Sequence, residues 1–143
     1  AAQQDTIYRL YLAQRARVNN WNLVDSSAPG IVGAHLLQRD RAVLYELAQS
    51  PVLWERRIAV LATLTFIRAH DFTDIQQLSA LLLKDPHDLM HKACGWMLRE
   101  IGDRSRATLE AFLRDHHSRM PRTMLRTAIE KLPPAQRAAW LAA

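Results

Sequence analysis

Residues 51–61 read Pro-Val-Leu-Trp-Glu-Arg-Arg-Ile-Ala-Val-Leu, and Ser50 stands directly before them. A capping residue followed by proline is typical of the first turn of a helix, because that turn has no use for the missing N–H. The basic pair Arg56 and Arg57 comes next and is followed by a run of apolar residues. The segment therefore predicts a long helix over 51–69, and the plain interpretation of its charged pair is the solvated side of an amphipathic helix.

The same kind of opening recurs twice along the chain. Prolines that open predicted helices lie at positions 51, 86 and 121, at equal intervals of 35 residues, and a shorter helix is predicted before each next proline. A helix pair repeated at this period indicates an α-solenoid, in which each pair buries its apolar face by stacking on its neighbours. The apolar ladder after a basic pair favours HEAT-like repeats, with the three opening helices parallel in one layer. Because the repeats are degenerate, a non-repetitive helical bundle remains the alternative.

The whole chain is predicted to be all-α. It contains only four glycines, and no stretch alternates apolar and polar residues long enough to indicate a strand. Residues 18–27 form the least regular segment. We expect helices at 5–17, 28–38, 41–49, 51–69, 74–83, 86–101, 105–116, 121–131 and 134–142.

No linker rich in glycine, proline or serine divides the sequence, so we expect residues 1–143 to form a single HEAT-like helical-repeat domain built of antiparallel helix pairs. The chain enters a helix almost at once. A solenoid usually begins with an atypical polar capping repeat. We therefore expect this domain to be the C-terminal part of a longer helical pattern.

Composition excludes several classes of protein. Hydrophobic residues make up 49% and charged residues 23% of the 143 residues, which excludes wholesale disorder. The single cysteine, Cys94, excludes an intramolecular disulfide and a multi-cysteine zinc site. The longest apolar run, 58–67, is too short to cross a bilayer, and no secretory signal is visible. We expect a cytoplasmic protein without membrane association.

The charge points to a polyanionic partner. The formal net charge is +5, and 16 of the 19 basic residues are arginine, whose planar guanidinium binds phosphate with two hydrogen bonds. Residues 101–143 hold most of the excess, with eight basic and four acidic residues. Nucleic acid is the first candidate for such a partner.

Common catalytic and cofactor motifs are absent. The sequence has no glycine-rich phosphate loop, no His-Glu-x-x-His and no nucleophile elbow. His87 and His91 have a spacing that could hold a metal on a helix, but no third ligand is obvious, and an exposed polar first turn is the favoured interpretation. We expect no metal site.

The unusual segment is 19–27, which reads Asn-Asn-Trp-Asn-Leu-Val-Asp-Ser-Ser. Trp21 and Asp25 are four residues apart, so on a helical turn an indole and a carboxylate would share one face. The plainer interpretation is a buried Trp21, with Asp25 capping a helix that begins near Ala28. Trp96 likewise has a plain interpretation as a core aromatic residue.

Three motifs in the same order resemble one family. They lie on predicted helices between about Tyr8 and Pro134 and are similar to motifs of the AlkD-type bacterial DNA alkylation-repair glycosylases. The motifs are Trp21-x-x-Val24-Asp25, Leu53-Trp54-x-x-Arg57 and Lys92-Ala93-x-Gly95-Trp96-x-Leu98-Arg99-Glu100. The resemblance implies a concave, basic HEAT-like solenoid that binds duplex DNA.

The resemblance also implies roles for single residues in catalysis. Asp25 matches the catalytic carboxylate of the family. Trp21 and Trp96 match the two aromatic residues that pack against the sugar and backbone of the damaged nucleotide. The chain departs from the pattern at Asn22, where the family more often has an acidic residue.

DNA-binding residues carry over from the same motifs. Arg57 matches an arginine that contacts a phosphate, Arg99 matches a second, and Lys92 stands at the head of the third motif. The family additionally carries N-terminal helices that precede the first motif of this chain.

The function that the resemblance implies is hydrolysis of the N-glycosidic bond of cationic N3- or N7-alkylated purines in duplex DNA. No metal or organic cofactor is expected, and we expect a monomer. The alternative is a non-catalytic HEAT-like scaffold that binds DNA or a protein partner. The catalytic interpretation requires Asp25, Trp21 and Trp96 to converge on one arginine-lined surface, whereas a scaffold allows them to be buried separately.

Overall fold

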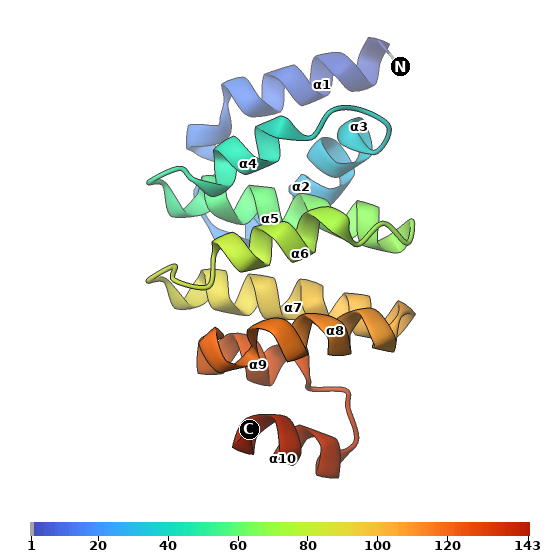
Figure 1. The fold of residues 1–143 in the computed structure, drawn as a ribbon. Coiled ribbons are helices and arrows are strands. Elements are labelled where there is room, and N and C mark those ends of the chain that lie inside the picture. Colours follow the sequence, from blue (N-terminus) through green and yellow to red (C-terminus); the bar gives the residue numbers. More distant parts are fainter. Residues whose placement is uncertain (1) are drawn as a thin grey trace. The chain divides into compact units, whose positions relative to one another are not determined.

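A computed structural model describes residues 2–143, and all regular secondary structure in this range is helical (Figure 1). No strand occurs in that range, which confirms the all-α prediction. Within the same residues, no helix combines the length and the apolar character needed to cross a membrane. The chain divides into two compact units, Ala1–Asp71 and Phe72–Ala143, and the solenoid over the whole chain stays a prediction.

The first unit is built around one central helix. Its α-helices are α1 (Ala2–Ala13), α2 (Trp21–Ala28), α3 (Ala34–Leu36), α4 (Ala42–Ala48) and α5 (Leu53–Arg68). A 3₁₀ turn at Arg15–Arg17 follows α1, and a π-helical segment at Pro29–Gly33 joins α2 to α3. Helix α5 packs against α2, the π-helical segment and α4, and it is buried from Arg57 to Leu64. A helix that is apolar nearly all round is expected at the centre of a core.

Helix α2 corrects the prediction for residues 18–27. The segment is helical from Trp21, and Asn20 is its N-cap, since the Asn20 side chain accepts a hydrogen bond from the Leu23 N–H at 3.0 Å. The helix expected to start near Ala28 therefore starts earlier, and Asp25 lies inside it rather than capping it. The prediction placed a helix start near Pro29 because proline is common in the first turn of a helix. Pro29 is accommodated in the π-helical segment instead, where the hydrogen-bond ladder is already interrupted.

Close packing between the π-helical segment and α5 depends on Gly33. The Thr65 hydroxyl of α5 donates a hydrogen bond to the Pro29 carbonyl at 2.6 Å. A Cβ at Gly33 would collide with the Ala62 carbonyl oxygen and lie 2.6 Å from Thr65 Oγ1. The absence of a side chain at Gly33 therefore allows the π-helical segment to approach α5 closely.

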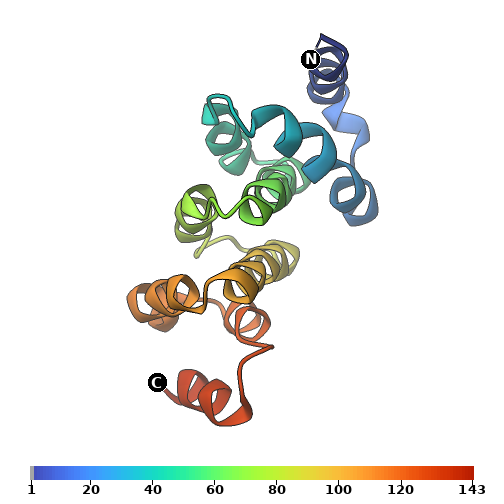
Figure 2. The same ribbon diagram turned by 90° about the vertical axis from the view of Figure 1, so that its right-hand side faces the viewer.

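The second unit has two layers of helices. It contains α6 (Thr73–Leu81), α7 (Asp88–Arg104), α8 (Arg106–His116), α9 (Arg122–Ala128) and α10 (Pro134–Ala142). Figure 2 views these helices nearly end-on, with α6 and α8 in one layer and α7 and α9 in the other. Helix α7 runs antiparallel to α6 and α8 and parallel to α9, against which it packs (Figure 1). The predicted side-by-side arrangement of opening helices is thus present for the two that belong to this unit.

The prolines at 51 and 86 lie ahead of their helices rather than inside them. The Val52 N–H donates to Ser50 Oγ at 3.0 Å, and the His87 N–H donates to Asp85 Oδ1 at 2.9 Å. Ser50 and Asp85 therefore stabilise short turns around the prolines, a common use of these side chains. The helices begin after these turns, and the predicted starts at 51 and 86 are two residues too early.

Gly33 and Gly30 form a matched pair for testing the packing of the first unit. We expect Gly33→Ala to lower the free energy of unfolding by about 1–3 kcal/mol, because the added methyl group overpacks the contact with α5. A Cβ at Gly30 meets nothing within 4 Å, so we expect Gly30→Ala to be neutral or to stabilise by up to about 1 kcal/mol. Urea unfolding followed by circular dichroism measures both. Equal destabilisation by the two variants would contradict the assigned role of Gly33.

Candidate functional site

Asp25 and Arg57 form a two-pronged ion pair between α2 and α5. Arg57 Nε donates to Asp25 Oδ1 and Arg57 Nη2 donates to Asp25 Oδ2, each at 2.9 Å. The two residues are 32 positions apart in the sequence. Parallel hydrogen bonds of this kind fix the plane of the carboxylate as well as its position, and they are stronger than bonds between neutral groups.

The two partners differ in how far their side chains are buried. The side chain of Arg57 is 7% exposed and that of Asp25 is 17% exposed. Arg57 is therefore enclosed in the unit, so its interpretation as a solvated residue is wrong, whereas the Asp25 side chain is partly exposed. An ionised carboxylate has about four acceptor positions, of which Arg57 occupies two. Asp25 thus presents a fixed negative charge with acceptor capacity remaining for a water molecule or a ligand.

Trp21 lies one helical turn before Asp25 on α2. It is 56% exposed, so the plainer interpretation of Trp21 as a buried residue is wrong. Because residues i and i+4 of a helix share a face, the Trp21 ring and the Asp25 carboxylate lie on the same side of α2. A large aromatic side chain left in solvent beside a fixed carboxylate is unusual for a residue with only a structural role.

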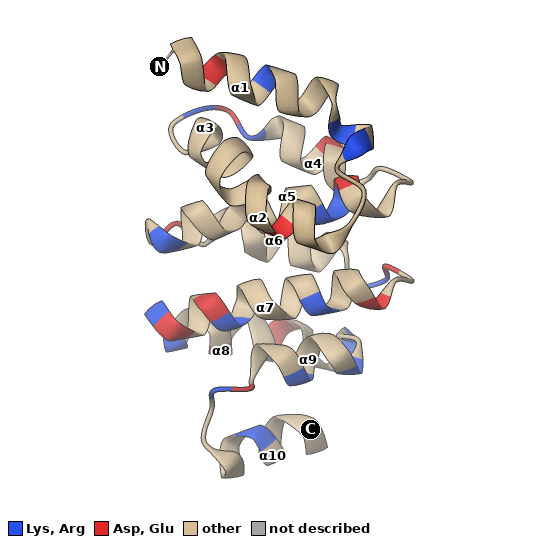
Figure 3. Ribbon diagram, turned by 180° about the vertical axis from the view of Figure 1, so that it is seen from behind, with Lys and Arg blue, Asp and Glu red and all other residues tan. Residues whose placement is uncertain are grey.

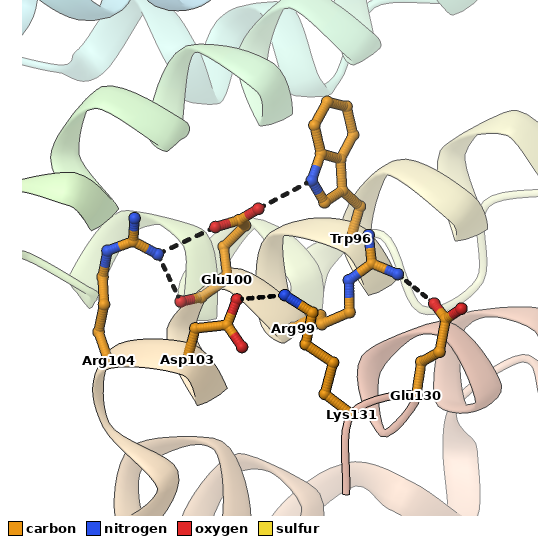
Figure 4. A network of polar contacts seen from close by, with 7 residues as sticks. All are labelled: Trp96, Arg99, Glu100, Asp103, Arg104, Glu130 and Lys131. Carbon is orange, nitrogen blue, oxygen red and sulfur yellow. Dashed lines mark hydrogen bonds and ion pairs between the residues drawn. The ribbon is translucent and has the colours of Figure 1, made fainter.

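Trp96 belongs to α7 of the second unit. Its indole N–H donates to Glu100 Oε1 at 3.2 Å (Figure 4), and its side chain is neither fully buried nor fully exposed. The interpretation of Trp96 as a core aromatic residue is therefore wrong. The convergence of Asp25 and Trp96 on one surface stays a prediction, because the two residues belong to different units.

The basic residues of the third motif also lie on α7, and both have acidic partners. Lys92 is 58% exposed and lies 3.3 Å from Asp88. Arg99 forms an ion pair with Glu130, which follows α9. A hydrogen bond from Thr123, followed in strength by one from Lys92, holds the pKa of Asp88 below its usual value. Lys92 is the more accessible of the two cations to a phosphate.

His87 and His91 have structural partners. His87 is the N-cap of α7, and its Nδ1 accepts a hydrogen bond from the Leu89 N–H at 3.1 Å. His91 Nε2 lies 2.5 Å from the Asp85 carbonyl oxygen. Among residues 2–143, no group of three or more histidine, cysteine, aspartate or glutamate side chains is placed to hold a metal ion.

Two features of the site were missed in the sequence. The pairing of Asp25 with Arg57 has no local signal, because the residues are distant in the chain and meet only when α2 packs on α5. The partners of Trp96 do have a signal, since Glu100 and Arg104 follow it at successive intervals of four residues, which places all three on one face of α7.

Residues 1–132 match a protein family described as DNA alkylation repair enzyme. The chain belongs to this family. No curated protein sequence and no solved structure matches the chain significantly. The family match extends through the first unit and most of the second, so both take part in a fold associated with repair of alkylation damage in DNA.

Membership of the DNA alkylation repair family directs attention to the basic residues of the chain. Figure 3 shows lysine and arginine on helices of both units. Helix α9 carries two exposed arginines, Arg122 and Arg126, and no acidic residue. Basic side chains that are not offset by acids on their own helix favour binding to the phosphates of DNA.

Removal of Arg57 tests whether the ion pair stabilises the first unit. We expect Arg57→Ala to lower the free energy of unfolding by about 2–4 kcal/mol, because it leaves the Asp25 carboxylate partly buried without its partner. Arg56→Ala is the matched control, since Arg56 is the adjacent residue of α5 and is less buried. Chemical denaturation of both variants measures the difference. An equal loss of free energy of unfolding in the two variants would show that the Asp25–Arg57 pair adds no stability beyond what Arg56 contributes.

Proposed function

We propose that this protein is a DNA glycosylase that hydrolyses the N-glycosidic bond of N3- or N7-alkylated purines in duplex DNA. We further propose that it acts as a monomer and without a metal or organic cofactor. The observation that carries the proposal is the Asp25 carboxylate, held by two hydrogen bonds from Arg57 in a partly exposed side chain, one helical turn after the exposed Trp21. Membership of the DNA alkylation repair enzyme family supports it.

The chemistry of alkylated purines suits a site of this kind. An N3- or N7-alkylated purine carries a positive charge, so its bond to the sugar C1′ breaks with the electron pair passing to the base. The base leaves neutral without needing a proton from an acid. Water forms the new bond to C1′ and releases one proton, which balances the charge. The difficult point is the positive charge that develops on the deoxyribose, as in glycoside hydrolysis.

In this proposal Asp25 is the catalytic residue that stabilises the positive charge on the deoxyribose. A fixed carboxylate close to the sugar stabilises the cationic transition state, because it is oriented before the reaction begins. The acceptor positions that Arg57 leaves open can also hold the attacking water. Arg57 fixes the carboxylate in the plane of the guanidinium, so we assign Arg57 a positioning role rather than a primary contact to phosphate.

Trp21 and Trp96 are proposed to contact the sugar of the damaged nucleotide. The face of an indole is electron-rich and attracts cations and polarised C–H groups. Either ring can therefore stabilise positive charge on a sugar that it contacts. Lys92 and Arg99 are proposed to bind phosphates on the DNA backbone, which requires that DNA compete with Asp88 and Glu130 for them.

The first unit also has an apolar feature that suits the alternative, a scaffold bound to a protein partner. A groove of about 400 Å³ lies along α1 and the segments after it, and Ile7 and Leu10 are exposed by 45% and 60%. Exposed apolar surface of this kind is typical of interaction sites. A scaffold would bind its partner through this groove and would release no base from DNA.

Replacement of Asp25 by asparagine tests the glycosylase proposal at its centre. We expect Asp25→Asn to slow single-turnover release of N7-methylguanine from duplex DNA by about a hundredfold to a thousandfold, the usual effect of removing one fixed electrostatic group. Affinity for DNA should not fall, because a negative charge is removed from a surface that meets a polyanion. The variant will also be less stable, since Arg57 loses its charged partner.

Asp71→Asn is the matched control for that loss of stability. Asp71 forms an ion pair with Arg41 in the same unit, with an N–O distance of 2.7 Å, and has no part in the proposed reaction. Release rates are compared at a temperature where circular dichroism shows every variant folded. Unchanged release by Asp25→Asn would remove Asp25 from the mechanism. Release by none of the proteins, on any cationic purine, would favour the scaffold.

Binding to DNA should depend strongly on salt, because each neutralised phosphate releases counterions. We expect Lys92→Ala to reduce the slope of log affinity against log salt concentration by about one, whereas Lys92→Arg should leave the slope unchanged. Titration of fluorescent duplex DNA at several salt concentrations measures both. Identical slopes for Lys92→Ala and the parent protein would exclude a phosphate contact at this position.

A further inference from the structure

Trp96 heads a chain of hydrogen bonds along one face of α7 (Figure 4). Its indole N–H donates to Glu100 Oε1 at 3.2 Å, and Arg104 Nη1 donates to the other oxygen, Glu100 Oε2, at 2.9 Å. Arg104 Nη1 also donates to the Glu100 backbone carbonyl at 2.9 Å. The three residues are spaced by four, so each side chain reaches the next along the helix surface.

This arrangement restricts the ring more than a single hydrogen bond would. A glutamate side chain has several rotamers. An exposed glutamate that no other residue held would change rotamer, and an indole bonded to it could move as well. Here the second oxygen of Glu100 is held by Arg104, and the two side chains are only 22% and 24% exposed. Charge-assisted bonds that are shielded from water are stronger than exposed ones. The Trp96 N–H is therefore bonded to a carboxylate that is itself held by Arg104.

The hydrogen bond to Glu100 also determines which atoms of Trp96 a ligand can contact. The N–H edge is taken by Glu100, and in Figure 4 the six-membered ring points away from that carboxylate. The ring then offers a ligand its π-face and carbon edges rather than a hydrogen-bond donor. A carboxylate bonded to the N–H polarises the indole and makes its face more negative, which strengthens attraction to positive charge.

The neighbouring ion pairs serve a different purpose. Asp103 accepts from Lys131 at 2.7 Å, and Arg99 pairs with Glu130, so these two bonds join α7 to the segment that follows α9 (Figure 4). The polar partners of Glu100, by contrast, both lie on α7 itself. The polar contacts of the Trp96–Glu100–Arg104 group therefore join side chains within α7, rather than joining α7 to another segment.

We propose that Glu100, braced by Arg104, is a positioning residue that orients the Trp96 indole toward the sugar of the damaged nucleotide. The inference rests on the proposed glycosylase function and adds a specific device to it. Glu100 does not touch the substrate. It keeps the electron-rich face of Trp96 in one orientation, where it can meet the positive charge that develops on the deoxyribose.

Replacement of Glu100 separates positioning from folding. We expect Glu100→Ala to slow single-turnover release of N7-methylguanine by about tenfold to a hundredfold, the effect of a misplaced contact in an active site. Affinity for undamaged duplex DNA should not fall. Glu100→Gln keeps one oxygen that can accept from the Trp96 N–H but loses the second acceptor for Arg104, so its rate should lie between those of the parent and Glu100→Ala. Asp103→Ala is the matched control, because it breaks a neighbouring ion pair that does not involve Trp96.

A second readout reports on the ring without requiring activity. The protein has four tryptophans, and the indole N–H signal of Trp96 in a ¹⁵N spectrum is identified by its loss in Trp96→Phe. In Glu100→Ala this signal should shift and its heteronuclear NOE should fall, whereas Asp103→Ala should largely preserve both. Thermal melts of all variants are recorded in parallel.

The outcomes are distinct. If the parent protein is active and Glu100→Ala releases N7-methylguanine at the parent rate, the positioning role is overturned and the glycosylase proposal stands. Equal loss of rate and stability in Glu100→Ala and Asp103→Ala would reduce Glu100 to a structural residue. An unchanged Trp96 signal in Glu100→Ala would show that the carboxylate does not hold the ring. A parent protein that releases no base would overturn the glycosylase proposal and this inference with it.

Discussion

The Asp25–Arg57 ion pair is the interaction on which the organisation of the first unit depends. It joins α2 to the central helix α5 through two parallel hydrogen bonds, at a place where Arg57 is almost wholly withdrawn from water. A guanidinium in that environment requires a charged partner with good geometry. The geometry in turn requires α2 and its continuation to lie close to α5, which the π-helical segment at Pro29 and the bare backbone of Gly33 permit.

The pair also reconciles two demands on a protein that binds DNA. A lone carboxylate on the surface would repel phosphates and oppose binding. Paired with Arg57, the carboxylate belongs to a neutral group when viewed from a distance, because the two charges cancel. At short range the exposed oxygen edge still acts as a negative charge. In the proposed reaction, Asp25 can therefore act on a cationic sugar without opposing the approach of the DNA backbone.

The two proposed tryptophan contacts are held in different ways. Trp21 is exposed on the first turn of α2, and its proximity to Asp25 follows from helical spacing alone. Trp96 is oriented by Glu100 and Arg104 on a single helix. Both arrangements place an electron-rich ring on a rigid helix rather than on a loop, which suits a site that must stabilise charge without rearranging during the reaction.

The sequence by itself determined the features that depend on local spacing. Apolar periodicity and the scarcity of glycine predicted an all-helical chain, and the spacing of Trp21 and Asp25 predicted a shared helical face once the segment was helical. The three motifs also led to the correct family. Helix starts at 51 and 86 were wrong by two residues, since Ser50 and Asp85 stabilise turns as readily as they cap helices.

Only the tertiary structure decided how residues far apart in the sequence meet. The pairing of Asp25 with Arg57 joins positions 32 residues apart, and no local pattern encodes it. The helix from Trp21 through Pro29 was missed for the same reason. A proline disfavours helix continuation in isolation, but packing against α5 and the hydrogen bond from Thr65 to the Pro29 carbonyl outweigh that preference. Local propensities are small free energies, and the burial of a core helix exceeds them, so position and exposure follow from packing.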